Sequence, residues 1–329
     1  MIRSIKTIMR QDREPYRVPR RVQDVIPIQC VWPDGIFKVG IKFSKTYRFT
    51  DINYKVASRN DKETMFLAYS ELLNSLDCAA TTKLTICNRR QSQADFEQSV
   101  LMPMQEDGLD KYRREYNQML MDKATGANGI TQEKYVTITV YKRDIEDARA
   151  YFARIGADLT ARFAALGSKC VELDATDRLR ILHDFYRAGD EGNFHFDMAD
   201  MARKGHDFKD YICPDGIEKH SDYLKLGDRY CRVLFLKDYA NYIQDEIVTN
   251  LTDLDRNMML SIDILPVPTD EAVREIQNRL LGVETNVTNW QRRQNANNNF
   301  SAIVPYDMEL QRKETKEMLD DLTTRDQRM

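Results

Sequence analysis

The sequence predicts an α+β fold of repeated strand–helix–strand units, of the split βαβ or ferredoxin-like kind, with antiparallel or mixed sheets. Short apolar or alternating runs of strand length recur along the chain, and stripes of apolar residues at helical spacing lie between them. In one place strand, helix and strand follow one another within about forty residues, which is the size of a βαβ-type unit. Two earlier stretches repeat this order, so we expect three related units.

The stretch 229–268 shows the order most completely. Its apolar run 233–236 is long enough for a buried strand and too short for a buried helix. Apolar residues at helical spacing follow over 239–251, and the run 258–265 alternates between apolar and polar residues, which is typical of a half-buried strand. Pro266 ends this strand because proline cannot donate to a sheet ladder.

The composition is that of an ordinary globular protein. The chain has 329 residues, of which 42% are apolar and 31% charged, and this length exceeds one typical hydrophobic core. The sequence holds no run of about 18 apolar residues, the length that a membrane-spanning helix needs. A net charge of −3 argues against a general nucleic-acid binder, which usually has a strongly basic face.

The six cysteines include no Cys-x-x-Cys pair, and the first residues lack the apolar core of a secretion signal. We therefore expect reduced, buried thiols in a cytosolic protein.

Four parts are expected along the chain. Residues 1–30 form a basic arm, 31–130 a first α/β unit with a helical extension, 131–268 the second and third α/β units, and 269–329 a C-terminal helical hairpin. A loop-rich insertion at 188–228, with five glycines, interrupts the third unit, and we expect it to lie on that unit's surface.

In the first unit, the expected order is strand, strand, helix, strand. The first two strands are predicted to form a hairpin around Ser44. Asn60 and Glu63 have the spacing of a capping box and are predicted to open the helix. The elements predicted here are strands at 36–43, 45–52 and 80–87, the helix that starts at Asn60, and two further helices near 96–101 and 109–120.

In the second unit, Asp144 and Asp174 are expected to cap helices, since an apolar stripe at helical spacing follows each of them. Strands are predicted beside these helices at 135–141 and 170–173.

After Pro268, one helix is predicted from 269 past Trp290 and a second over 308–322, and the two are expected to form an antiparallel hairpin. The second helix has few apolar residues among many charged ones. We therefore expect it to be the least protected helix of the chain and a contact surface in a larger assembly.

No catalytic, cofactor-binding or metal-binding residue is expected. The segment from Gly35 to Lys42 is the nearest approach to a phosphate loop, but Ile41 stands where lysine must follow the glycine, and the alternation is that of a strand. Imidazole and thiolate groups suit zinc, yet their spacings here are seven to twelve residues rather than two to five. These residues are His183, His195, His206, Cys213 and His220.

Two groups of residues are candidates for an interaction surface. The basic arm carries Arg17, Arg20 and Arg21, which are either a solvated tail or a contact with anionic lipid or an acidic partner. Farther on, Trp290, Arg292 and Arg293 precede an asparagine-rich stretch. They are either a polar helix end or a contact with phosphates or base edges.

An alternative function is the binding of single-stranded nucleic acid. Split βαβ units can present aromatic residues on a strand to bases. Tyr135 and Tyr141 lie six residues apart on one predicted strand, and this spacing puts both rings on one face.

Four stretches carry a resemblance to a known family. They are KTYRFTDINYKVASRNDKETMFLAYSELLNSLD (45–77), DKATGANGITQEKYVTITV (122–140), GDRYCRVLFLKDYANYI (227–243) and MMLSIDILPVPTDEAVREIQNRLLGVETNVTNWQRRQNANNNFSAIVPYD (258–307). They resemble the amino-terminal region of the CagE/TrbE/VirB family of type IV secretion ATPases, and most of all its conjugative-element branch in Gram-positive bacteria.

The resemblance implies a docking and assembly domain that precedes a RecA-like motor with Walker motifs. The motor is not among these residues, so ATP is expected as a cofactor only there, and this chain is expected not to be an enzyme. The implied partners are inner-membrane subunits of the secretion system, the motor of the same family and further copies of the chain. The implied location is cytoplasmic, peripheral to the inner face of the cell membrane.

Overall fold

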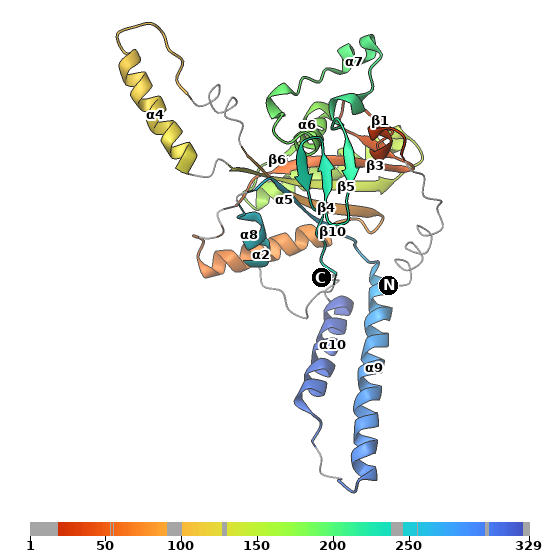
Figure 1. Cartoon of the computed structure of the whole chain (residues 1–329). Coiled ribbons are helices and arrows are strands. Elements are labelled where there is room, and N and C mark those ends of the chain that lie inside the picture. The colour runs from red at the N-terminus through yellow and green to blue at the C-terminus, as the bar shows by residue number, and fades with distance from the viewer. Residues whose placement is uncertain are drawn as a thin grey trace. The chain divides into compact units, whose positions relative to one another are not determined.

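The computed structural model describes residues 19–52, 54, 56–90, 101–126, 130–237, 246–254, 256–299 and 303–324. The chain divides into two compact units, and each draws on three separate stretches. Unit 1 comprises the described parts of 1–41, 86–133 and 173–260, and unit 2 those of 42–85, 134–172 and 261–329. The fold is α+β, as the sequence predicts (Figure 1).

The described strands form two sheets. The larger sheet has the order β1-β2-β3-β5-β4-β10, with β6 paired to β3, and the smaller sheet has the order β7-β8-β9. Every pairing with a defined register is antiparallel. The strands are β1 (Cys30–Val31), β2 (Phe37–Val39), β3 (Lys42–Phe49), β4 (Ala80–Arg90), β5 (Ile130–Tyr141), β6 (Cys170–Glu172), β7 (Ile217–Lys219), β8 (Leu224–Leu226), β9 (Arg229–Cys231) and β10 (Met258–Ile264).

Helices occur between the strands and at the carboxyl end of the described chain. The α-helices are α2 (Arg59–Asn74), α4 (Asp110–Gly126), α5 (Ile145–Ala165), α6 (Ala175–Tyr186), α7 (Met198–Lys204), α8 (Glu246–Thr252), α9 (Thr269–Ala296) and α10 (Tyr306–Thr324). Short 3-10 helices are η1 (Val22–Val25), η2 (Glu191–Asn193) and η3 (Phe208–Tyr211).

The core of unit 2 lies where α5 packs on the face of β3 and β5. Phe43 pairs with Val140 and Tyr47 pairs with Val136 across the two strands, and all four side chains are buried. Asp144 caps α5 as predicted, because its side chain accepts a hydrogen bond of 2.9 Å from Asp147 N. The cap and the apolar stripe together fix where α5 begins and which face it buries.

A glycine in α5 lets this helix approach β3 very closely. Tyr47 is fully buried, and its hydroxyl donates to Phe152 O at 3.3 Å. A Cβ atom at Gly156 would overlap Glu172 Oε1 and lie 3.0 Å from Tyr47 Oη. The same Glu172 pairs through Oε2 with the buried Lys45 at 2.6 Å. The glycine is therefore needed for space and not for backbone freedom.

The core of unit 1 contains residues of the predicted insertion. The side chains buried together are Ile26, Ile28, Phe37, Leu179, Phe196, Phe208, Ile212 and Cys213. Four of these belong to 188–228, so the expectation that the insertion is a surface feature was wrong. The aromatic and apolar residues of the insertion cover the apolar sides of α6 and of the segment after η1. Arg178 joins α6 to the segment around β2, because its guanidinium donates to Gly35 O at 2.7 Å and lies over the Phe37 ring.

The run 233–236 is not a buried strand. It has no regular secondary structure, and Leu234 and Phe235 are each 82% exposed. An apolar run is buried only if another element covers it, which its own composition cannot guarantee. The helix predicted next is described only over α8, and the rest of 239–251 lies outside the described residues, as does most of 96–101. The strand predicted at 258–265 is confirmed as β10.

Two features of the first unit, a turn and a helix cap, lie a few residues away from their predicted positions. The turn between β2 and β3 is at Gly40 and not at Ser44, because Gly40 adopts a φ of 60° that a residue without a Cβ adopts freely. The N-cap of α2 is Ser58 and not Asn60, and the Ser58 hydroxyl accepts from Asp61 N at 3.3 Å.

The C-terminal helical hairpin is confirmed. The helices α9 and α10 pack side by side, with Val287, Thr315 and Leu322 buried (Figure 1). Lys316 of α10 pairs with Glu284 of α9 at 3.7 Å. The helix α10 therefore packs through one narrow face, while most of its charged residues are exposed.

The expectation of buried thiols holds only in part. All six cysteines are free, but Cys170 and Cys213 alone are buried, and Cys30 is exposed. Cys30 lies on the two-residue strand β1, which covers too little surface to hide it.

The Gly156→Ala substitution is predicted to destabilise unit 2. The added methyl group would push the Glu172 carboxylate aside and crowd the buried Tyr47 ring, and overpacking of this kind costs about 1–3 kcal/mol. The matched control is Gly282→Ala in α9, where a Cβ would meet nothing within 4 Å. This control should be neutral or stabilise by up to about 1 kcal/mol. Urea unfolding followed by circular dichroism measures both, and equal midpoints for the two variants would contradict the close-approach account.

Candidate interaction surfaces

The helix α4 and the segment before it form a self-contained module, residues 101–126. Asn117, which is buried, links the two parts through a reciprocal pair of hydrogen bonds. Its Oδ1 accepts from Met102 N, and its Nδ2 donates to Met102 O, each at 2.9 Å. Such a pair satisfies both backbone groups of one residue and so fixes the segment against the helix.

A charged cluster closes the other end of this module. Arg113 bonds to Asp110 Oδ1 at 2.7 Å and to Asp107 Oδ2 at 2.7 Å, and it also reaches Gln105 Oε1 at 3.2 Å. The hydrogen bonds with Arg113 lower the pKa of both carboxyl groups below their ordinary value. The module is therefore held by groups that stay charged at neutral pH.

The side chains that this module leaves exposed form an apolar stripe, called here the α4 stripe. It consists of Leu109, which directly precedes α4, and of Tyr112, Tyr116 and Met119 on the helix, all of them exposed. Their spacing of three, four and three residues is that of a narrow coiled-coil seam. Exposed apolar patches of this kind mark interaction sites in soluble proteins.

A second exposed surface lies at 229–237, called here the basic-apolar segment. Its apolar side chains are the run 233–236, and its charged residues are Arg229, Arg232 and Lys237, with no acidic residue among them. Arg232 ties the segment to the small sheet, because its Nε donates to Asp222 O at 3.0 Å.

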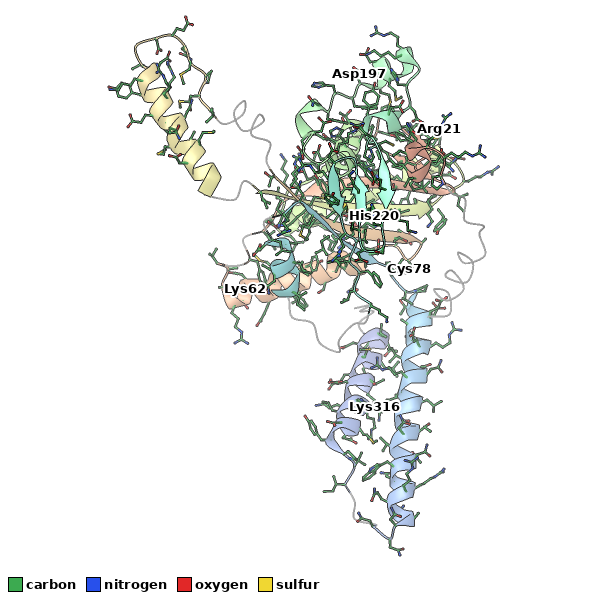
Figure 2. All side chains as sticks on the ribbon, in the orientation of Figure 1. Arg21, Lys62, Cys78, Asp197, His220 and Lys316 are labelled. Atoms are coloured by element: carbon green, nitrogen blue, oxygen red, sulfur yellow. The ribbon has the colours of Figure 1, made fainter. Side chains whose placement is uncertain are left out.

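Aromatic rings form a row along the small sheet. His220, labelled in Figure 2, stacks on Tyr223 with ring centroids 4.4 Å apart, and Tyr223 meets Tyr230 edge-on at 5.4 Å. Tyr230 is largely exposed, and it pairs across the sheet with Lys225. The row thus continues the basic-apolar segment with rings that have an apolar body and a polar end.

A partly buried charged network lies elsewhere in unit 1. The Asp184 carboxylate accepts from Arg89 and lies 3.2 Å from His183 Nδ1, and Arg89 also pairs with Glu133 at 3.5 Å. Burial, and then the charge of Glu133, raises the pKa of the neighbouring Cys87 thiol to about 12. This thiol is protonated at neutral pH and is a poor nucleophile. The network therefore ties β4, β5 and α6 together, and its residues are too far apart in sequence to form a recognisable motif.

The predicted interaction arginines are exposed where the structure describes them. Arg20 and Arg21 are exposed in unit 1, whereas Arg17 lies outside the described residues (Figure 2). In unit 2, Arg292 and Arg293 are exposed at the end of α9. Trp290 is half-buried beside them. The two groups belong to different units, so each is a candidate surface by itself.

The histidines do not converge. His183 is buried against Phe194, His195 is exposed, and His206 faces Asp210 at 3.9 Å. Within the ranges that the structure describes, no three His, Cys, Asp or Glu side chains are placed to hold a metal ion.

The aromatic face proposed for nucleic acid is not formed. Tyr135 is only 4% exposed, while Tyr141 is exposed with Lys42 over its ring. The pleat puts both side chains on one face of β5, but it does not determine how much of that face is covered. The two rings therefore cannot serve as a shared stacking surface.

Comparison with protein-family models and with curated proteins finds no match for this chain. Among the described helices, none combines the length and the apolar character that a bilayer crossing needs.

Removing the Asn117 clamp is predicted to loosen the 101–126 module. In Asn117→Ala the two hydrogen bonds to Met102 are lost, so amide exchange at 102–105 should be about tenfold faster. The control is Arg114→Gln on the same helix, an exposed residue that should change nothing. Hydrogen exchange with mass spectrometry makes the comparison. Unchanged exchange at 102–105 in Asn117→Ala would show that the module is not held as described.

Proposed function

We propose that the chain is the amino-terminal docking and assembly domain of a conjugative-transfer, type IV secretion ATPase of the CagE/TrbE/VirB family. In this role it anchors the motor to the inner-membrane complex during transfer of DNA or protein. The family comes from the sequence resemblance of the four stretches given above. The observation that carries the docking role is the α4 stripe, an apolar seam on a helix that its own module holds in place.

The composition of the α4 stripe suits a protein partner. Tyrosine and methionine are enriched at protein–protein interfaces, and tyrosines are frequent among the residues that dominate binding energy. The Asn117 and Arg113 contacts fix the helix before binding, which lowers the entropy cost of association. A helix with apolar residues at this spacing fits a groove or a second helix of a membrane subunit.

Other exposed residues offer surfaces for further partners. Phe66 and Leu67 of α2 are exposed, while Leu72 and Leu73 of the same helix are buried. We assign the exposed pair, Phe66 and Leu67, to self-association. The hairpin of α9 and α10, with Trp290, Arg292 and Arg293, is assigned to the motor, which follows this region in the resembling family.

We place the chain on the cytoplasmic side, peripheral to the inner face of the cell membrane. The exposed Arg20 and Arg21 support this placement, because basic residues are attracted to anionic lipid headgroups.

The proposal assigns no ATP hydrolysis to this chain, and ATP is expected only in the motor. The segment closest to a phosphate loop contains β2 and the turn at Gly40, and it does not open a helix as a phosphate loop does.

Docking through the α4 stripe is tested with the inner-membrane subunits of the same conjugative element. The double variant Tyr112→Ser with Tyr116→Ser should bind the membrane subunit at least about tenfold more weakly, because each ring is an interface anchor. The matched control is Tyr141→Ser with Tyr306→Ser, two other exposed tyrosines that lie off the stripe. Affinity lowered in both variants alike, or in neither, would refute docking through the stripe.

The non-enzymatic role is tested by ATP turnover of the purified chain. No turnover above background is expected. Turnover that persists through repeated purification, with ATP bound at micromolar affinity, would overturn this part of the proposal.

A further inference from the structure

The apolar run 233–236 of the basic-apolar segment is largely exposed among the residues that the structure describes. All four apolar side chains of 233–236 are more than half exposed. The described residues therefore cover little of Val233, Leu234 and Phe235, which are 72–82% exposed, although runs of this composition normally form strands in a core. A partner that covers them has to surround the run rather than contact one face of it.

The charged residues of the segment indicate the charge of its partner. Arg232 and Lys237 adjoin the apolar run on either side, whereas the nearest acidic residues, Asp228 and Asp238, lie beyond the cations. Positive charge is thus concentrated beside the exposed apolar residues. The complementary partner is anionic.

The same charges disfavour a second copy of the run. If two copies paired antiparallel over the full run, Arg232 would stand opposite Lys237 of the other chain. If they paired parallel and in register, each cation would stand opposite itself. Like charges directly opposite each other on paired strands are destabilising.

The residues around the run match a lipid interface. Tyr230 is exposed next to Tyr223 on the small sheet, and tyrosine is enriched where apolar and aqueous regions meet. Two of the cations are positioned by the fold, since Arg229 Nε donates to Ala188 O at 3.0 Å and Arg232 Nε donates to Asp222 O at 3.0 Å. Each guanidinium keeps further N–H donors for phosphate oxygens.

We propose that residues 229–237 bind an anionic lipid surface. The side chains of 233–236 enter the boundary between headgroups and acyl chains, and Arg229, Arg232 and Lys237 contact the headgroup phosphates. A bilayer surrounds the inserted side chains on all sides, which a groove that contacts one face does not do. This inference rests on the peripheral location in the proposed function and assigns a site to it.

The test is co-sedimentation of the purified chain with vesicles of equal parts phosphatidylcholine and phosphatidylglycerol. The wild-type chain should bind these vesicles and should bind pure phosphatidylcholine vesicles far more weakly. Leu234→Gln with Phe235→Gln should lower the affinity at least about tenfold, because two inserted apolar side chains are lost. The matched control, Leu281→Gln with Ile303→Gln, removes two exposed apolar side chains elsewhere and should bind as the wild type does.

The charge contribution has its own pair of variants. Arg232→Gln with Lys237→Gln should lower binding to the mixed vesicles by roughly thirtyfold, from about 1 kcal/mol for each cation near an anionic surface. Arg274→Gln with Arg279→Gln changes the net charge equally at exposed residues of α9 and should have no such effect.

Each contrary outcome has a separate meaning. Wild-type binding that Leu234→Gln with Phe235→Gln leaves unchanged would overturn this site while the peripheral location stands. No binding to anionic vesicles, together with tight binding to the membrane subunit, would overturn the lipid contact while the docking role stands. If the Leu234 and Phe235 substitutions weaken binding of that subunit in detergent without lipid, or abolish a dimer seen by analytical ultracentrifugation, the segment is a protein interface and the lipid contact is wrong.

Discussion

The close approach of α5 to β3 at Gly156 is the constraint on which the core of unit 2 depends. A helix can lie this near to a strand only where it has no side chain, and here the space is taken by the Tyr47 hydroxyl and the Glu172 carboxylate. That approach lets Tyr47 donate to Phe152 O and be fully buried. It also brings Glu172 to the buried Lys45, whose charge would otherwise have no counter-ion in the core.

The cores of the two units leave a specific set of apolar residues at the surface. The α4 stripe and the run 233–236 are exposed, although their composition would suit a hydrophobic core. In both places polar contacts hold the backbone: Asn117 and Arg113 fix the α4 module, and Arg232 ties the basic-apolar segment to the small sheet. Apolar side chains that a fold presents in this way, instead of burying them, are typical of surfaces that bind partners. The proposed docking function rests on this division of the apolar residues.

The sequence predicts well those elements whose signals are local and agree with one another. The helices α5 and α6 are capped by Asp144 and Asp174, since in each the cap and the apolar stripe indicate the same start. The hairpin of α9 and α10 could be predicted equally well from the sequence, because its helices are long and the segment between them is rich in asparagine. Burial was less predictable. The run 233–236 and Tyr135 were each misjudged, one as buried and the other as exposed, because burial depends on which distant element covers a side chain.

The candidate surfaces were harder to predict than the fold for the same reason. The spacing of Leu109, Tyr112, Tyr116 and Met119 indicates a helix face, but it does not reveal whether that face is covered. The contact between Asn117 and Met102, which holds the preceding segment against α4, joins residues that are fifteen positions apart in the sequence. The network of Arg89, Glu133 and Asp184 joins three distant parts of the sequence and has no local signature at all.

The central claim is that the α4 stripe docks the chain on a membrane subunit, and photo-cross-linking in cells that carry the conjugative element tests it most directly. A benzophenone amino acid replaces Tyr116 on the stripe in one strain and Arg114, on the opposite side of the same helix, in another. The account predicts a cross-link to an inner-membrane subunit from position 116 and none from position 114. Equal cross-links from both positions, or none from position 116 in an assembled and active machine, would contradict it.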